Sequence, residues 1–298
     1  MTDFEPGTVT AAVIGPAAVG AVQTVVTGPS SRSRSRALTV RRGTLTGVCG
    51  RYAASRSPDD LVEEFEVDEV VVQAPLEPDF NVAPTKPVYA VLTRRGRDQT
   101  EHDPPLRQLR VLQWGLVPSW AKDPSIGSRL INARTETVAD KPAFRKAFAR
   151  RRCLLPADGY YEWYAARGDG AGARKAPKQP FYIHPKDAGV LAMAGIYEFW
   201  RDRSVDPDAS GGWLWTCAVL TTVAEDSLGR IHDRMPLFVE PDRYGHWLDP
   251  GRDDPVDLLS LLVPAAPGRL DAYPVRTLVN NYRNNGPELL VPMTAAVE

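Results

Sequence analysis

The 298-residue chain is 43% hydrophobic and 24% charged, ordinary values for a folded globular protein, and leaves room for one large domain or two small ones. Its formal net charge of −1 excludes a global basic field that would attract nucleic acid over the whole surface. The three cysteines lack metal-ligand spacing such as C-x-x-C, which argues against a zinc site, and their odd number favours a reducing compartment over a disulfide framework.

The first 47 residues lack the pattern of a folded segment. The apolar stretch at 11–26 is broken by glycine and proline and is too short to span a membrane. The acidic start does not suit a secretory signal, whereas the Arg- and Ser-rich run at 30–43 loosely fits an organellar transit peptide. We therefore predict that residues 1–48 are disordered or absent from the mature protein, and that the folded domain spans 49–298. Without the leader's five arginines and two acidic residues, 31 basic and 35 acidic side chains remain, a net charge of −4.

From residue 49 onward the pattern predicts short helices and many strands. Ser57 before Pro58 is a typical helix start, because a serine hydroxyl caps free backbone N–H groups and proline suits the first turn. In chain order we expect a helix at 57–67, strands at 87–95 and 106–118, a basic helix at 141–152, strands at 179–185, 189–200, 214–224 and 236–240, and a helix at 254–264. The segments 168–179 and 201–212 have the composition of loops.

Strands dominate this series and do not alternate regularly with helices. That pattern argues against a doubly wound parallel sheet and for a mostly antiparallel barrel or sandwich. We predict an α+β fold, a single domain built on a mostly antiparallel, barrel-like β core with a few short helices. The chain contains no internal repeat, P-loop or G-x-G-x-x-G motif.

Four stretches place polar or ionisable side chains among apolar or aromatic neighbours. They are 48–52, 130–137, 157–164 and 231–237. Glu162 lies between Tyr161 and Trp163, where partial desolvation would suit it to general acid–base work. The alternative is a strand position whose carboxylate faces solvent between two inward-pointing aromatic rings.

The other three stretches each contain a candidate with a plainer alternative. His232 is a candidate proton-transfer group, or a hydrogen-bonded structural histidine. Asn132 would orient a substrate oxygen and Arg134 would hold a phosphate, or the two are a turn-stabilising amide and a surface cation. Cys49 is the candidate nucleophile, although a mid-chain cysteine is more often a small buried apolar group.

Seven motifs follow one another in a fixed order along the chain. They are C-G-R-Y (49–52), N-V-A-P-T (81–85), W-G-L-V-P-S-W (114–120), I-N-A-R-T-E-T (131–137), R-C-L-L-P-A-D-G-Y-Y-E-W (152–163), I-H-D-R-M-P (231–236) and N-N-G-P-E-L-L (284–290). This series closely resembles the SRAP family of SOS-response-associated peptidases, the abasic-site processing proteins. The resemblance covers about residues 49–293, nearly all of the segment that we expect to fold.

The resemblance implies a covalent chemistry for Cys49. In that family the cysteine is the second translated residue, and removal of the initiator methionine leaves an amine and a thiol on adjacent carbons. The amine would condense with the ring-opened aldehyde of an abasic site in single-stranded DNA, and the thiol would close the resulting Schiff base into a thiazolidine. An α-amine with a pKa of about 7.7–8.0 is partly neutral at cytosolic pH, whereas the amide nitrogen of a mid-chain cysteine is not nucleophilic.

The leader conflicts with this chemistry, because Cys49 has no free amine while Val48 is attached to it. Either translation begins at position 48, where a GTG codon would be read as methionine, or the leader is cleaved between Val48 and Cys49. The Ala-, Arg- and Pro-rich composition is typical of a high-GC coding sequence and favours the first explanation. Both explanations make Cys49 the mature N-terminus.

The resemblance also implies roles for the other motif residues. Asn132 would position the sugar-derived oxygen or the thiazolidine. Glu162 would transfer protons during ring opening, at the Schiff base and in reversal of the crosslink, and His232 would act on the ring oxygen or in β-elimination. The predicted DNA-contacting residues are Arg51, Asn81, Trp120, Arg134, Arg145 and Arg234, supplemented by a basic track at 145–152. With a net negative domain, binding to DNA should be modest and dependent on salt.

The predicted partner is therefore single-stranded DNA that contains abasic sites. We expect a cytoplasmic, nucleoid-associated monomer that uses no metal, no cofactor and no membrane, with AP-lyase and autoproteolytic activity as possible accompaniments. Two other classes of protein stay open. One is a cysteine peptidase that combines Cys49 with His232 and either Glu162 or Asn132. The other is a non-catalytic single-strand-binding module, whose function would survive a Cys49→Ala substitution.

Overall fold

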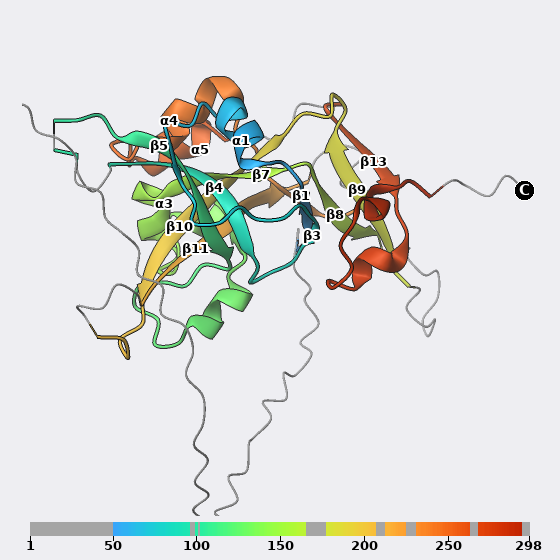
Figure 1. Ribbon diagram of the computed structural model, residues 1–298, viewed down its shortest axis with the longest axis horizontal. Helices are drawn as coiled ribbons and strands as arrows, with labels where there is room; N and C mark the ends of the chain where they lie inside the picture. The colour runs from blue at the N-terminus through green and yellow to red at the C-terminus, as the bar shows by residue number, and fades with distance from the viewer. Residues whose placement is uncertain are drawn as a thin grey trace, which may run out of the picture. The chain divides into compact units, whose positions relative to one another are not determined.

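Five strands close into a small barrel at the centre of the fold (Figure 1). In spatial order they are β11 (Trp213–Val223), β10 (Leu191–Arg201), β7 (Arg152–Ala157), β4 (Pro87–Arg94) and β5 (Leu106–Trp114). Neighbours pair antiparallel except at the closure, where β5 meets β11 in parallel. Three short strands extend this sheet, namely β2 (Glu69–Val71) beside β5, and β6 (Asn132–Arg134) and β12 (Arg234–Pro236) beside β11.

The computed structural model describes residues 50–95, 99–100, 102–164, 177–206, 212–224, 231–262 and 268–293. Cys49, the predicted leader and most of the loop predicted at 168–179 lie outside these residues. What the sequence predicts for those segments therefore stays a prediction.

A second, wholly antiparallel sheet packs beside the barrel. Its strands in spatial order are β13 (Leu270–Pro274), β9 (Gln179–Pro185), β8 (Gly159–Tyr164), β1 (Tyr52–Ala54) and β3 (Asp79–Val82). Asp158 connects the two sheets, because it lies between β7 and β8 and its carboxylate accepts a hydrogen bond of 2.6 Å from the Ser55 backbone N–H. β1, the first described strand along the chain, lies between β8 and the edge strand β3 in this second sheet.

Short helices and 3-10 turns fill the remaining layers. The α-helices are α1 (Pro58–Glu64), α2 (Thr135–Val138), α3 (Arg145–Arg150), α4 (Tyr244–Leu248) and α5 (Pro255–Ser260). The 3-10 helices are η1 (Pro124–Arg129), η3 (Pro241–Arg243), η4 (Thr277–Asn280) and η5 (Pro287–Leu290). Figure 1 shows α1, α4 and α5 gathered on one side of the barrel. The predicted α+β class, with a mostly antiparallel barrel and few short helices, is confirmed.

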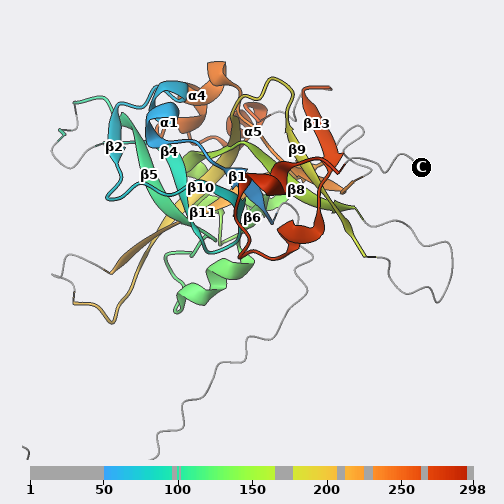
Figure 2. The ribbon, with the colours of Figure 1, turned by 45° about the vertical axis from the view of Figure 1, so that its right-hand side comes forward.

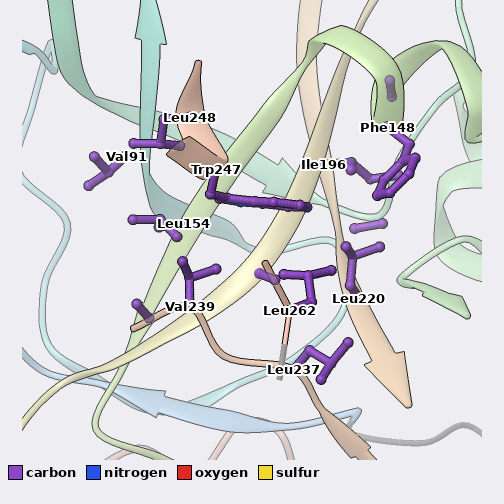
Figure 3. Close-up of a cluster of buried hydrophobic side chains, with 14 of the residues drawn as sticks. Val91, Phe148, Leu154, Ile196, Leu220, Leu237, Val239, Trp247, Leu248 and Leu262 are labelled. Atoms are coloured by element: carbon purple, nitrogen blue, oxygen red, sulfur yellow. The ribbon is translucent and has the colours of Figure 1, made fainter. Parts of the chain in front are cut away.

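The barrel strands separate two hydrophobic cores. Leu92 and Cys153 point into the barrel, whereas their neighbours Val91 and Leu154 point outward and pack with Trp247 of α4 (Figure 3). The Trp247 indole N–H donates to the carbonyl oxygen of Cys153 at 3.0 Å, which ties the helix to the strand. Because both faces of these strands are buried, the sequence runs are nearly continuously apolar and not strictly alternating.

The predicted basic helix at 141–152 is wrong at both ends. Helix α3 spans only Arg145–Arg150, and Arg152 already belongs to β7. The cause is the burial of Arg152, whose guanidinium donates to carbonyl oxygens of α3, α4 and the turns after α4. The accepting residues are Phe148, Ala149, Trp247, Asp249 and Arg252. Burial lowers the pKa of this guanidinium to about 10, so it stays charged at neutral pH.

Other predicted helices and strands are also shorter in the structure than the sequence pattern suggests. The strand predicted at 106–118 ends at Trp114, because Gly115 adopts a φ of +126° and turns the chain. The strand predicted at 236–240 is wrong, since β12 ends at Pro236 and residues 237–239 bond to β10 and β11 outside any regular strand. The helices predicted at 57–67 and 254–264 end at Glu64 and Ser260.

Gly195 allows β7 and β10 to approach each other inside the barrel. A Cβ atom at this position would lie 2.8 Å from Sγ of Cys153 and 3.1 Å from a methyl carbon of Leu155. We expect G195A to lower the free energy of unfolding by about 1–3 kcal/mol, the usual cost of overpacking, as measured by urea denaturation.

The matched control is G245A on α4, where the added Cβ would meet no atom within 4 Å. Alanine is the better helix former, so this variant should be as stable as the wild type or slightly more stable. An equal loss of stability in both variants would show that crowding inside the barrel is not the cause.

Candidate functional site

The carboxylate of Glu162 lies on the face of the second sheet that is turned toward the barrel. In the register between β1 and β8, Tyr52 faces Tyr160, and the Tyr161 N–H donates to the carbonyl oxygen of Arg51 at 2.9 Å. Side chains alternate along β8, so Glu162 shares the face of Tyr160. Glu162 is only 3% exposed, which rules out the solvent-facing alternative.

Aromatic contacts join this face to the barrel. The rings of Tyr52 and Trp114 meet edge to face at 5.2 Å, and those of Tyr160 and Phe238 lie 6.4 Å apart. All four residues belong to the core that fills the barrel. Continuing the register two residues beyond the Tyr52–Tyr160 pair places Gly50, the first described residue, opposite Glu162.

Asn132 and Arg134 are positioned by β6, which pairs in parallel with β11. The strand is anchored at the preceding residue, because the carbonyl oxygen of Ile131 accepts from the Trp114 indole N–H at 2.9 Å and from the Val219 N–H at 3.0 Å. Asn132 is half-buried and Arg134 is exposed. The barrel closure thus presents the 131–137 motif at the end of the barrel where Trp114 lies.

Arg234 lies on β12, and its terminal guanidinium N–H groups already donate to protein acceptors. Its guanidinium holds the Glu136 carboxylate with two hydrogen bonds of 2.6 and 3.1 Å and donates to the Thr221 carbonyl oxygen at 2.7 Å. The hydrogen bonds from Arg234 hold the pKa of Glu136 below its usual range. This clamp joins the 131–137 and 231–237 motifs across β11, so the structure brings these two predicted stretches together.

His232 is partly exposed and is oriented by the start of β12. Its Nδ1 accepts a hydrogen bond of 3.1 Å from the Arg234 backbone N–H and also lies 3.0 Å from a carboxylate oxygen of Asp233. To accept the bond from the Arg234 N–H, Nδ1 must carry a free lone pair and no proton. To donate to Asp233, the same nitrogen would have to carry a proton, so the two contacts exclude each other. We favour the backbone contact, because the Asp233 side chain is 87% exposed and its ion pairs are screened. A neutral ring then carries its proton on Nε2.

Arg51 and Asn81 connect the second sheet to the C-terminal segment rather than to solvent. The Arg51 guanidinium donates to the Asn81 side-chain oxygen at 2.9 Å and to the Val279 carbonyl oxygen at 3.0 Å. The Asn81 amide nitrogen donates to the carbonyl oxygens of Val279, Asn281 and Asn284 at 3.1–3.2 Å. Figure 2 shows this segment lying against β1. Asn81 is fully buried and has no surface with which to touch DNA directly.

Burial lowers the pKa of Arg51, and the nearby charge of Asp79 offsets part of that effect. Arg51 directly precedes Tyr52, the first residue of β1, and its guanidinium bonds to Asn81 and Val279, whereas Tyr52 packs in the barrel core. The sequence contains the N-N-G-P-E-L-L motif at 284–290, to which the sequence pattern assigns no role. The structure shows that its start, at Asn284, is one of the anchoring points for Asn81.

Trp120 is 55% exposed on the loop between β5 and η1. It borders a cleft of about 420 Å³ together with Trp200, Arg201 and Arg203. The Trp200 indole N–H donates to the carbonyl oxygen of Ala121 at 2.7 Å, which fixes the loop next to Trp120. The side chain is therefore held at the surface with an aromatic face open to contact.

The basic residues of the predicted track at 145–152 lie in different surroundings. Arg145 is exposed on α3, but Arg150 pairs with Asp253 and Arg151 with Glu198, each at 2.6 Å. Arg152 is buried, as described above. Among the described residues of this run, Arg145 and Lys146 are the surface cations that have no carboxylate within 4.0 Å.

Within the described ranges, no cluster of three or more His, Cys, Asp and Glu side chains is arranged to hold a metal ion. No helix in the part of the chain that the structure covers is long and apolar enough to cross a bilayer.

Comparison with known proteins identifies the family. The family model described as "SOS response associated peptidase (SRAP)" matches residues 48–282, well over half of the chain. The chain belongs to the SRAP family. The abasic site processing protein YoqW of Bacillus subtilis (strain 168) is 37% identical over 245 residues, which are 82% of this chain and 99% of that protein.

Two further proteins with lower identity extend the comparison. The abasic site processing protein HMCES of Xenopus tropicalis is 28% identical over 276 residues, covering 82% of this chain and 78% of that protein. A crystal structure of a protein from Bacteroides thetaiotaomicron superposes with a TM-score of 0.65 at 25% identity, over 83% of this chain and all of that one. The fold described above is therefore shared with that protein.

The Asn81 amide should be a large contributor to stability. N81A would remove the amide donor to the carbonyl oxygens of Val279, Asn281 and Asn284, and it would leave the Arg51 guanidinium with Val279 as its remaining acceptor. We expect a loss of at least about 2 kcal/mol in the free energy of unfolding, with faster amide hydrogen exchange in 277–285. N285A is the control, because Asn285 is exposed and water replaces its bonds to Phe80 and Pro78, so its cost should stay below about 1 kcal/mol. Equal costs would contradict the anchoring role.

Proposed function

We propose that this SRAP protein processes abasic sites in single-stranded DNA by forming a covalent crosslink through Cys49 as its mature N-terminal residue. The observation that carries the proposal is the likeness to YoqW, a protein named for abasic site processing, over 99% of that protein's length. The motif residues Asn132, Glu162 and His232 supply the polar groups that this chemistry needs.

The proposed reaction joins one aldehyde to one aminothiol with the loss of one water. The neutral α-amine of Cys49 adds to the aldehyde carbon of the ring-opened sugar, and the carbinolamine loses water to give a Schiff base. The thiolate then adds to the same carbon, and the imine nitrogen takes up a proton to complete the five-membered thiazolidine. Each step moves protons, so a carboxylic acid beside the amine accelerates it.

The position of Glu162 supports it as that proton-transfer group. Gly50 lies opposite Glu162 in the β1–β8 register, and one trans peptide unit of about 3.8 Å separates the Cα atoms of Gly50 and Cys49. Glu162 is 3% exposed, so bulk water has little access to its carboxyl group. We assign Asn132 to orient the sugar-derived oxygen, and His232, with its proton on Nε2, to serve as the acid–base group at the ring oxygen.

The DNA-binding residues take different roles in this proposal. Arg134 and Arg145 are exposed and would contact phosphates directly, and Trp120 offers its open face to an unstacked base. Arg51 and Asn81 would act by anchoring the segment at Gly50–Tyr52, which directly follows Cys49 in the sequence. We keep Arg234 as a phosphate ligand that also stabilises the 131–137 motif through Glu136.

We propose further that residues 1–48 are not part of the active protein. The SRAP family model begins its match at residue 48, and about a sixth of this chain has no counterpart in YoqW or in the Bacteroides thetaiotaomicron structure. Initiation at position 48 and cleavage after it both release the amine of Cys49.

A cysteine peptidase is the second candidate, favoured by the description of the family as a peptidase. This activity needs the Cys49 thiol and an amide substrate but no free α-amine. Cleavage of the chain's own leader would be its simplest form, and it would generate the amine that the crosslink requires.

The state of the N-terminus separates these proposals. A protein that starts with methionine directly before Cys49, and loses that methionine, should crosslink to an oligonucleotide with one abasic site in a heat-stable form. Its C49S variant should give only a Schiff base that borohydride can trap, because a hydroxyl closes the ring poorly. Full-length protein whose mass shows that residues 1–48 are retained should form no crosslink. A stable crosslink by that uncleaved chain would refute the N-terminal mechanism.

Glu162→Gln tests the proton-transfer role in the protein that starts at Cys49. The amide keeps the size of the side chain but holds no transferable acid proton, so crosslinking or its reversal should slow by about 10- to 1,000-fold. The measurement is the time course of crosslinking on a denaturing gel from pH 6 to pH 8. Glu63→Gln, an exposed change on α1, is the matched control and should react at the wild-type rate. Wild-type rates in E162Q would remove Glu162 from the mechanism.

A further inference from the structure

A second concave site lies at the end of the barrel away from β6 and β12. β4 and β5 run antiparallel, with Pro87 opposite Gln113 near the candidate site and Arg94 opposite Leu106 at the other end. At this far end a cleft of about 440 Å³ is bordered by arginine and aromatic side chains. They are Arg94, Arg95, Arg150, Arg151, Tyr197 and Phe199. The volume lies within the range of small-molecule sites in proteins.

The cationic charge of this cleft is only partly neutralised. Arg150 and Arg151 are paired with Asp253 and Glu198 at 2.6 Å. Among the described residues, no carboxylate lies within 4.0 Å of the guanidinium of Arg94 or Arg95. Arg95 donates from Nε to the Asp103 carbonyl oxygen at 3.3 Å, so of the two arginines Arg94 is the one whose charge is less offset at the edge of the cleft.

Arg94 is exposed yet held in place by aromatic rings. Its guanidinium carbon lies 5.0 Å from the centroid of Phe199 and 5.2 Å from that of Trp215. Arg110 lies over the same Trp215 ring at 4.5 Å. Burial lowers the pKa of Arg110, and the neighbouring charge of Arg94 adds to that effect, so the two cations repel each other. A bound anion would relieve this repulsion.

We propose that this cleft binds a nucleotide, with Arg94 and Arg95 holding the phosphate groups and the base stacking on the plane of Arg94 and the wall formed by Phe199. A guanidinium binds phosphate oxygens through its N–H edge while its planar face stacks on an aromatic ring or a base. The nucleotide comes either free from solution or as part of a nucleic-acid strand. This site is separate from the Glu162 region and does not depend on the proposed crosslinking activity.

The test is calorimetric titration of the whole protein with three probes, ATP, inorganic pyrophosphate and a ten-residue oligothymidylate. We expect ATP to bind with a Kd below about 1 mM, and pyrophosphate to bind about tenfold more weakly because it lacks a base. The double variant R94Q/R95Q should weaken ATP binding at least about tenfold, whereas R129Q/R276Q, which removes two exposed charges outside the cleft, should not. Thermal unfolding of each variant checks folding, and R95Q alone replaces the double variant if that one fails to fold.

The oligothymidylate identifies the source of the nucleotide. Weaker binding of both ATP and the oligonucleotide to R94Q/R95Q would support a strand as the ligand, and weaker binding of ATP alone would support a free nucleotide. Pyrophosphate binding as tight as that of ATP would overturn the stacking half of the proposal. The whole proposal fails if neither ATP nor the oligonucleotide binds at about 1 mM, or if R129Q/R276Q loses as much affinity as R94Q/R95Q.

Discussion

The pairing of β11 on both of its edges is the constraint on which the rest of the structure depends. Around Thr216 and Cys217 the strand bonds to β10 on one edge and to β5 on the other, and this closes the barrel. Around Thr221 it bonds to β6 and β12 instead. One strand therefore builds the barrel with its first half and holds the 131–137 and 231–237 motifs with its second half. A shift of this register by one residue would invert every side chain of β11, so barrel packing and site geometry are specified together.

The sequence predicted the elements whose identity rests on local pattern. The strands at 87–95, 179–185, 189–200 and 214–224 are long, apolar and rich in branched or aromatic residues, and the structure contains each of them within one or two residues. β1, β3 and β6 have only three or four residues each and carry no pattern that a local reading would detect. Their strand geometry comes from pairing with segments distant in sequence, which no short window contains.

The candidate site also combines features that local sequence pattern predicts with features that depend on contacts between distant segments. The burial of Glu162 follows from alternation along β8, but the choice of which face is buried depends on the barrel that packs against it. Asn81 was identified as a motif residue, yet its partners lie about 200 residues further along the chain, so its anchoring role was invisible in the sequence. The Arg234–Glu136 clamp likewise joins two motifs that only β11 brings together.

Counting arginines says little about where this protein holds anions. Arg152 is committed to backbone carbonyl oxygens, Arg51 to Asn81 and Val279, and Arg234 to Glu136 and Thr221. The terminal N–H groups of Arg234 already donate to Glu136 and Thr221. A phosphate that approaches Arg234 must share these donors with the Glu136 carboxylate, which is also negatively charged. It gains less from Arg234 than from the exposed Arg134, whose charge needs no prior rearrangement. Removing the Glu136 carboxylate frees the Arg234 donors but loosens the motif that carries Asn132, so phosphate affinity and site geometry oppose each other at this residue pair.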